Sequence, residues 1–245
     1  MPEQLLNGKV ALVTGGARRI GRGIALSLAE AGADMAITYL TSQAEASATV
    51  KEIAARGRRA LDLKCDVRAE ESVCAMVAEV VGQFGRLDLV VNNAGVFDSG
   101  PLDALTVERW DKVFETNVRG PFLVARAALP HLLKTGGRIV NLGSLGGIRA
   151  WASHAHYCAS KAALHMLTEA MAKAFAPEVS VNCVAPGWIQ AGGEDAGLAA
   201  RLAARTPMAR SGTIDDVARA VLFFATGPTF VTGEILTVDG GLGLV

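Results

Sequence analysis

The sequence predicts an α/β fold, a doubly wound parallel sheet of about seven strands that is covered by helices on both faces. Short runs rich in β-branched and aliphatic residues recur along the 245-residue chain, and longer segments with helical periodicity lie between them. Several of the short runs are apolar throughout, which is typical of strands buried on both faces of a parallel sheet. No tract rich in proline, glycine and serine divides the chain, so we expect one domain over residues 1–245.

The expected elements alternate in order along the chain. The first strand, residues 10–14, precedes a helix over residues 20–31 that is rich in alanine and leucine and is closed by Gly32. Later strands are expected over residues 35–39, 60–65, 87–92, 138–142, 179–184 and 235–238. Further helices are expected over residues 43–56, 70–84, 107–133, 157–175 and 214–224, with a short one over 198–205. Ligands of such sheets bind beyond the carboxyl ends of the strands, so the turns after the strands are the segments to search.

The composition excludes several classes of protein. Lys and Arg number 24 and Asp and Glu number 24, so no overall positive charge is present to attract nucleic acid. The four cysteines lack Cys-x-x-Cys spacing, and His154 and His156 lack partners at metal-ligand spacing, so we expect reduced thiols and no metal site. The N-terminal residues resemble neither a signal peptide nor a membrane span. We therefore expect a cytoplasmic protein that binds neither nucleic acid nor membrane.

The turn after the first expected strand has the composition of a dinucleotide-binding turn. It reads TGGARRIG over residues 14–21 and opens the first helix. Gly15 and Gly16 allow a tight turn with no Cβ atom in the way of a ligand, and Gly21 permits either close packing or close approach of a phosphate. The helix N-terminus adds unpaired N–H groups and the positive end of the helix dipole, which suit a pyrophosphate. Other tight turns share this composition, so the composition alone is weak evidence. The position of the turn directly after the first strand strengthens the prediction of a dinucleotide site.

Two arginines in this turn indicate which dinucleotide is bound. Arg18 and Arg19 stand at a helix N-terminus, where cations are unfavourable unless an anion is bound. From Tyr39 to Ser42, after the second strand, no acidic residue is present to accept hydrogen bonds from the ribose hydroxyls of NAD. With Arg18 nearby, hydroxyls at Thr41 and Ser42 favour a 2′-phosphate, hence NADP(H) over NAD(H). The two hydroxyls could also serve as helix caps.

A tyrosine and a lysine are the candidates for the chemistry. Tyr157 and Lys161 are four residues apart, on one face of an expected helix. A nearby ammonium favours the phenolate and lowers the pKa of a tyrosine, so the pair could act as a general acid or base on a carbonyl or an alcohol. Ser144 follows the strand over residues 138–142 and could polarise the same oxygen. Asn117 is unfavourable inside a helix, which suggests a specific hydrogen bond, although a solvated surface Asn also fits.

Together these residues resemble the short-chain dehydrogenase/reductase family over essentially the whole chain. The matching positions are residues 14–21, Asp66 and Val67, residues 92–95, Asn117, Ser144, Tyr157, Lys161, Pro186 and Gly187, Thr232 and Gly233, and residues 239–241. The resemblance implies a Rossmann-type fold and an oxidoreductase that transfers a hydride between a nicotinamide and a carbonyl or a secondary alcohol. It also implies a homotetramer or a homodimer, and a substrate lid around residues 188–210.

The resemblance assigns roles to individual residues. Tyr157 would be the catalytic acid or base, Lys161 would lower its pKa and hold the nicotinamide ribose, Ser144 would orient the substrate oxygen, and Asn117 would support a water-linked proton relay. The adenine end would contact Asp66 and Val67, and the nicotinamide would lie against residues 186–189. The full expected cofactor-binding set is Gly15, Arg18, Arg19, Ile20, Gly21, Tyr39, Thr41, Ser42, Asp66, Val67, Asn93, Ala94, Gly95, Tyr157, Lys161, Pro186, Gly187, Trp188 and Ile189.

One departure from the family pattern leaves alternatives open. Where the usual turn has glycine, this chain has Arg19, which resembles the pteridine reductase branch, as does the passage over residues 176–179. That branch commonly has Asp at the position of Ser144, whereas serine resembles the 3-oxoacyl-carrier-protein reductases and generic ketoreductases. We therefore prefer an NADP(H)-dependent carbonyl reductase, with 3-oxoacyl thioesters among its candidate substrates. A pteridine reductase and a non-enzymatic dinucleotide-sensing protein are the alternatives. The side chains of Phe97, Trp151, His154 and Trp188 could line the substrate pocket or pack in the fold.

Overall fold

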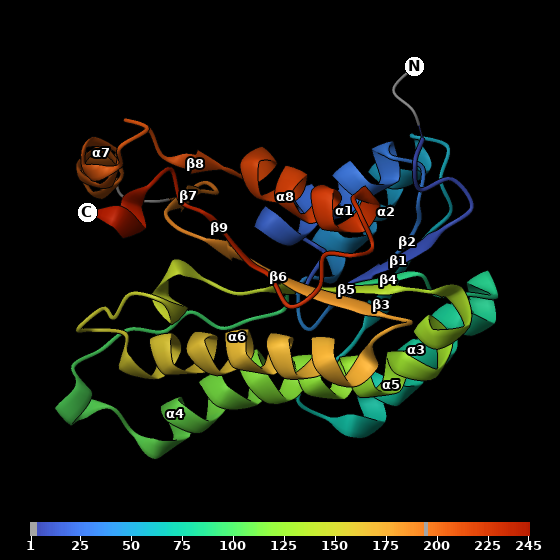
Figure 1. The fold of residues 1–245 in the computed structure, drawn as a ribbon, viewed down its shortest axis with the longest axis horizontal. Coiled ribbons are helices and arrows are strands. Elements are labelled where there is room, and N and C mark those ends of the chain that lie inside the picture. Colours follow the sequence, from blue (N-terminus) through green and yellow to red (C-terminus); the bar gives the residue numbers. More distant parts are fainter. Residues whose placement is uncertain (1–3, 194–195) are drawn as a thin grey trace.

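The computed structural model describes residues 4–193 and 196–245, and it confirms the predicted fold class (Figure 1). Seven strands form one parallel sheet in the order β3-β2-β1-β4-β5-β6-β9. They are β1 (Val10–Val13), β2 (Asp34–Tyr39), β3 (Ala60–Lys64), β4 (Leu89–Asn92), β5 (Arg138–Leu142), β6 (Ser180–Pro186) and β9 (Ile235–Val238). After β3 the chain returns past β1 to form β4 on its other side, and such a reversal of strand order is where α/β sheets bind ligands.

Helices cover both faces of the sheet, as Figure 1 shows. One face carries α1 (Arg19–Glu30), α2 (Gln43–Ala54) and α8 (Ile214–Thr226), and the other carries α3 (Glu70–Phe84), α4 (Val107–Phe114), α5 (Gly120–Thr135) and α6 (Ala155–Phe175). Short 3-10 turns are η1 (Leu102–Ala104), η3 (Leu145–Gly147) and η4 (Leu242–Leu244). Within residues 4–193 and 196–245, every helix is too short or too polar to cross a lipid bilayer.

The central strands divide the core into two halves. Ala11 and Val13 of β1 pack with α1 and α8, whereas Val10 and Leu12 of the same strand pack on the side of α3 and α5. This follows from the alternation of side chains along a strand, and it explains why β1 is apolar at every position. The sheet is therefore held from both sides, and the turns at its carboxyl edge start from fixed positions.

The expected helix over residues 107–133 is divided in two, so that prediction was wrong in one respect. A π-helical turn, η2 (Glu115–Arg119), lies between α4 and α5. There the Thr116 hydroxyl donates a hydrogen bond to the Lys112 carbonyl at 2.8 Å, and Asn117 turns inward with 0% of its surface exposed. Widened turns of this kind are frequent at functional sites. The alternative of a solvated surface Asn117 is excluded.

A second small sheet lies beyond the carboxyl edge and was not expected. It pairs β7 (Ile189–Gln190) with β8 (Gly212–Thr213), and α7 (Ala196–Arg205) lies between the two strands in the chain. The start of α8 is fixed by a capping box, in which Thr213 and Asp216 exchange hydrogen bonds with each other's backbone. The expected lid over residues 188–210 spans this region, and residues 194–195 within it lie outside the described part of the chain.

Candidate active site

The structure brings the predicted site residues to one edge of the sheet. The turn over residues 14–21 follows β1, residues 93–95 follow β4, and residues 186–189 end β6 and lead into β7. Ser144 follows β5, and Tyr157 and Lys161 lie in the first turns of α6. Because parallel strands all end at the same edge, these segments meet although the first and last of them, residues 14 and 189, are 175 positions apart in sequence.

Side-chain hydrogen bonds join the turn after β1 to the turn after β4. The Thr14 hydroxyl accepts from the backbone N–H groups of Asn93 and Ala94, both at 3.0 Å. The Asn93 amide donates to the carbonyls of Thr14 and Gly15 at 2.9 and 3.0 Å. A Cβ atom on Gly21 would lie 2.2 Å from the Gly15 carbonyl oxygen, so only glycine fits there. The two turns thus form a closely packed backbone floor at the N-terminus of α1.

Arg18 and Arg19 begin α1, as the sequence predicts. Arg18 is exposed and is the N-cap residue, with extended backbone and no side-chain cap, and the first turn of α1 contains no acidic residue. Arg19 has φ of +51°, in the left-handed region that favours glycine and costs other residues about 1–2 kcal/mol. The backbone at this position is thus one that glycine, the family's usual residue here, adopts without strain. Arginine in its place lowers the stability of the fold.

The expected adenine end is formed by residues after β2 and β3. Tyr39 ends β2, and Thr41 and Ser42 precede α2, where Ser42 is the N-cap but makes no side-chain cap bond. Asp66 binds the Arg68 guanidinium at 2.7 and 2.9 Å, and this ion pair lowers the pKa of the Asp66 carboxyl. The Asp66 side chain is thus already engaged within the chain.

The expected nicotinamide end follows β6. Gly187 packs against Asp239 so closely that a Cβ atom would lie 2.6 Å from the Asp239 Cβ. The Trp188 carbonyl accepts a hydrogen bond from the Gly212 N–H at 3.0 Å, and Ile189 pairs with the same residue in the small sheet. The Trp188 indole nitrogen is buried and has no hydrogen-bond partner among the described residues. A buried N–H of this kind calls for an acceptor from a bound molecule.

Tyr157 and Ser144 lie side by side at the edge of the sheet. The Ser144 hydroxyl accepts the Gly146 N–H at 3.0 Å and lies close enough to the Tyr157 hydroxyl to influence its pKa. Burial raises the pKa of Tyr157, and the neighbouring Ser144 hydroxyl opposes this only in part. This differs from the expectation that Lys161 lowers the pKa of Tyr157, because the loss of solvation outweighs other effects within the chain. Tyr157 is therefore a protonated phenol at neutral pH, ready to donate.

Lys161 is buried, with 6% of its surface exposed. Its ammonium donates a hydrogen bond to the Leu142 carbonyl at 2.7 Å and lies 5.9 Å from the centre of the Tyr157 ring. Burial lowers the pKa of Lys161 to about 8. At rest, the Lys161 ammonium therefore points to the end of β5.

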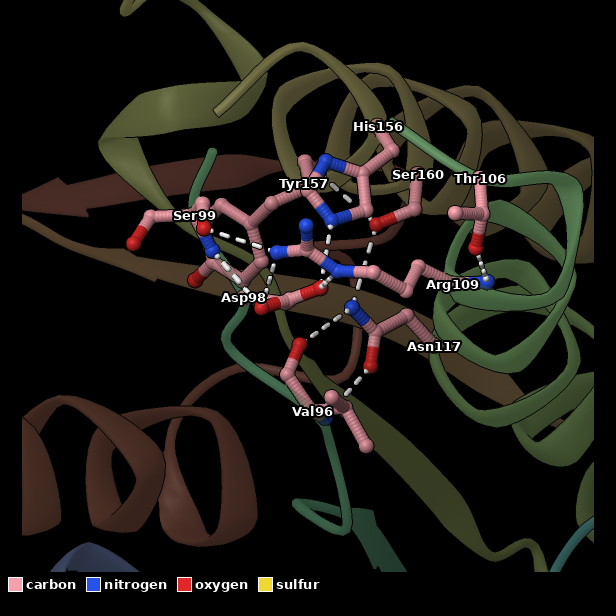
Figure 2. Close-up of polar contacts among 9 residues, drawn as sticks. All are labelled: Val96, Asp98, Ser99, Thr106, Arg109, Asn117, His156, Tyr157 and Ser160. Atoms are coloured by element: carbon pink, nitrogen blue, oxygen red, sulfur yellow. Dashed lines mark hydrogen bonds and ion pairs between the residues drawn. The ribbon is translucent and has the colours of Figure 1, made fainter. Parts of the chain in front are cut away.

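Asn117 ties the segment after β4 to α6, as Figure 2 shows. Its side-chain oxygen accepts the Val96 N–H at 2.8 Å, and its amide donates to the Val96 carbonyl at 3.0 Å and to the Ser160 hydroxyl at 3.1 Å. Ser160 in turn donates to the Tyr157 carbonyl at 2.7 Å. The side chain of Asn117 therefore positions the elements that carry Tyr157.

Sequence reasoning missed several residues that shape the site. His165, one turn after Lys161, accepts the Ser144 N–H at 3.4 Å, and burial together with the charge of Lys161 lowers its pKa to about 4. A Cβ atom on Gly143 would lie 2.2 Å from the His165 ring, so glycine there makes room for the imidazole. The pattern of Gly143 and Gly147 around Ser144 was a signal that a bulky group packs under this turn. Asp98, Arg109 and His156 were also missed, because their contacts join residues up to 58 apart.

Comparison with known proteins decides the family. A family model described as enoyl-(acyl carrier protein) reductase matches residues 15–243. The 3-oxoacyl-acyl-carrier-protein reductase of Staphylococcus aureus is 39% identical over 240 residues, which cover 96% of this chain and 98% of the relative. A crystal structure of a putative short-chain alcohol dehydrogenase from Sinorhizobium meliloti superposes with a TM-score of 0.93 at 34% identity, covering 98% of each chain. The chain belongs to the short-chain dehydrogenase/reductase family.

A further solved structure bears on the cofactor. A blue fluorescent protein from a metagenomic library, crystallised in complex with NADPH, superposes with a TM-score of 0.91 at 38% identity and covers 97% of this chain and 98% of that one. Short-chain dehydrogenases/reductases are oxidoreductases that use nicotinamide cofactors and act on small molecules. The residues of this chain fit such a cofactor, because Arg18 is exposed at the N-terminus of α1 where the first turn has no acidic residue, and because the buried Trp188 indole nitrogen has no partner among the described residues.

Proposed function

We propose that the protein is an NADP(H)-dependent oxidoreductase that transfers a hydride between the nicotinamide and a carbonyl or secondary alcohol, with Tyr157 as acid or base. The observation that supports it most directly is the adjacency of the Tyr157 and Ser144 hydroxyls, with the Lys161 ammonium 5.9 Å from the tyrosine ring. All three lie at the sheet edge where the glycine-rich turn also ends. Asn117 is the fourth proposed catalytic residue, through its bonds to Val96 and Ser160.

The residues divide the work of carbonyl reduction between them. When bound, NADPH supplies the hydride to the carbonyl carbon. Tyr157 gives its phenol proton to the carbonyl oxygen, so that the product is the neutral alcohol. Ser144 accepts from Gly146 and keeps its own proton to donate to the same oxygen, which orients the substrate. Lys161 stabilises the negative charge that the phenol oxygen gains as its proton leaves. In alcohol oxidation each step runs in reverse.

Three observations support NADP(H) over NAD(H). The residues that follow β2 include no carboxylate, Arg18 is exposed at the N-terminus of α1, and a relative at 38% identity was crystallised with NADPH. A 2′-phosphate beside Arg18 would meet both a guanidinium and the positive end of a helix dipole. The proposed contacts are otherwise those of the set expected from the sequence.

Replacing Arg18 by alanine tests this preference. We expect the Kd of NADPH to rise about 10-fold to 100-fold, because a hydrogen bond to a charged group contributes about 1.5–3 kcal/mol. The Kd of NADH should change little, since NADH has no 2′-phosphate. Titration of the two cofactors by nicotinamide fluorescence measures both values, with Arg126→Ala on the opposite face of the sheet as the control. Equal weakening of both cofactors would show that Arg18 does not bind the 2′-phosphate.

Turnover measurements separate the main proposal from its alternatives. We expect NADPH oxidation with ketones or an acetoacetyl thioester, because a serine beside the tyrosine suits a carbonyl oxygen. Activity confined to dihydrobiopterin would instead support a pteridine reductase, the hypothesis that Arg19 favours. Binding of NADPH without oxidation by any carbonyl compound, sugar or pterin would support a dinucleotide-sensing protein and overturn the proposal. Consumption of NADPH is followed by its absorbance, with substrate-free enzyme as the control.

We also propose that the chain associates as a homotetramer or homodimer. An apolar groove of about 390 Å³ supports this. It lies over α4, α5 and α6 and is lined by Phe114, Glu115, Val118, Arg119, Phe122 and Leu167. Half-exposed aromatic side chains such as Phe122 mark a surface suited to a second copy. The mass of the protein in solution, measured by light scattering, tests the proposal.

A further inference from the structure

We propose that the substrate carries an aromatic ring beside its reacting carbonyl, and that Phe97 is the residue that recognises this ring. The inference rests on the proposed function, because it needs Tyr157 to act on the carbonyl. It names a substrate class that neither the family nor its glycine-rich turn specifies.

Phe97 belongs to an aromatic wall around the reacting hydroxyl, formed by Phe97, Trp151, His154 and Tyr157. The Phe97 ring meets the Tyr157 ring edge-on at 4.8 Å between centroids, and it lies 4.8 Å from the His154 ring. The Trp151 ring is nearly parallel to the Tyr157 ring, with centroids 6.2 Å apart. Two rings, those of Phe97 and Trp151, thus contact the phenol that we assign as the proton donor, and His154 contacts both of them.

Phe97 is open to a ligand, whereas Trp151 is largely committed to packing. The side chain of Phe97 is 63% exposed. Trp151 covers Gly146, where a Cβ atom would lie 3.1 Å from the indole ring. An apolar ring that remains exposed beside a reacting group is the surface that a flat substrate would cover, because stacked or edge-to-face ring pairs are favourable.

The backbone on both sides of Phe97 is held in place, as Figure 2 shows. Before it, the N–H and the carbonyl of Val96 are both bound by the side chain of Asn117. After it, the carboxylate of Asp98 accepts two bonds from the Arg109 guanidinium, each 2.8 Å, and binds the buried His156 ring at 3.0 Å. These bonds lower the pKa of Asp98 far below its ordinary range, so the carboxylate stays charged at neutral pH.

The two sides of the wall are also tied to each other. The Gly100 N–H donates to the Ser153 carbonyl at 2.8 Å, which joins the Phe97 segment to the one that carries Trp151 and His154. His156, which binds Asp98, directly precedes Tyr157 on α6. The exposed ring is therefore fixed relative to the catalytic hydroxyl before any substrate arrives. Fixing a contact in advance removes part of the entropy cost of binding, which is what a recognition element requires.

Two ketones of similar size test the proposal: acetophenone, with an aromatic ring, and cyclohexyl methyl ketone, with a saturated one. The measured quantity is the selectivity ratio, kcat/KM for acetophenone divided by kcat/KM for cyclohexyl methyl ketone. Comparing this ratio between wild type and a variant cancels the intrinsic reactivity of each ketone. We expect Phe97→Leu to lower the ratio about 2-fold to 12-fold, the range of a ring–ring contact beyond its buried area. The loss should appear as a raised KM for acetophenone.

Matched variants make the result specific. Phe97→Tyr keeps a ring and should keep the wild-type ratio, and Phe230→Leu, at a fully exposed phenylalanine remote in sequence from the wall, should leave it unchanged. An unchanged ratio in Phe97→Leu, with both ketones reduced, would overturn this inference and leave the proposed function standing. If wild-type protein reduces no carbonyl compound at all, the proposed function itself fails, and this inference with it.

Discussion

Replacing Tyr157 by phenylalanine is expected to lower kcat for carbonyl reduction by a factor of about 10²–10⁴, the usual contribution of a positioned general acid. The change removes one oxygen atom and leaves the ring in contact with Phe97 and Trp151. Because the Tyr157 hydroxyl contacts Ser144 rather than the turn after β1, cofactor binding should be nearly unaffected. Single-turnover measurement of NADPH oxidation gives the rate, and fluorescence titration gives the Kd of NADPH.

The chain offers a matched comparison, because it has only two tyrosines. Tyr39 ends β2 on the expected adenine side, so Tyr39→Phe should act on the Kd of NADPH and not on kcat at saturating cofactor. A wild-type kcat in Tyr157→Phe would contradict the proposal that Tyr157 donates the proton. Loss of NADPH binding in the same variant would show that Tyr157 serves binding instead of proton transfer.

Replacing Lys161 by methionine is expected to lower kcat by a factor of about 10² or more, because the variant loses the ammonium that we propose stabilises the phenolate formed during proton transfer. Methionine has a similar length and no charge, so the helix keeps its packing. The exposed Lys173, also on α6, supplies the control variant Lys173→Met, which should retain wild-type kcat. Wild-type kcat in Lys161→Met would show that the ammonium takes no part in the reaction.

Stability distinguishes this loss from unfolding. The pKa of Lys161 falls from 10.5 to about 8 on folding, so below pH 8 the folded chain holds a charged amine that it disfavours by up to about 3 kcal/mol. As pH rises from about 8 to 10.5, the unfolded chain binds more protons at this group than the folded chain, and wild-type stability gains accordingly. Lys161→Met should therefore be at least as stable as wild type at pH 7, with an advantage that shrinks above pH 8. Urea unfolding of both proteins at pH 7 and at pH 9 measures the difference; reduced stability at pH 7 would contradict it.

Much of the fold followed from local patterns in the sequence. The strand over residues 138–142 was predicted with its correct first and last residues, and the turn over residues 14–21 was correctly predicted to lead into a helix. Both predictions rest on apolar runs and glycines, whose effects on structure are local in sequence. The π-helical turn at Asn117 was not predictable in this way, because the residue that Asn117 binds there, Val96, lies 21 residues earlier and leaves no local pattern. The small sheet of β7 and β8 was missed because each strand has two residues, too few to show a pattern.

The sequence predicted which residues form the site better than it predicted their pKa values and ion pairs. Tyr157, Lys161 and Ser144 were found from spacing and from their places after strands. The direction in which the pKa of Tyr157 moves was not found, since it depends on burial that only the packed structure reveals. The contacts of Asp98 with Arg109 and His156 were missed for a related reason: an ion pair between separate elements leaves no periodic trace in a sequence.

The left-handed backbone at Arg19 sets two selective pressures against each other at one position. Glycine would adopt this conformation freely, so variants chosen for heat resistance should drift toward it. Variants selected for tight binding of a phosphate-bearing ligand should keep arginine at this position, despite its unfavourable left-handed backbone conformation. A library randomised at this codon should therefore yield glycine under selection for thermal stability and arginine under selection for ligand binding. The natural arginine would then indicate that ligand binding was the stronger pressure.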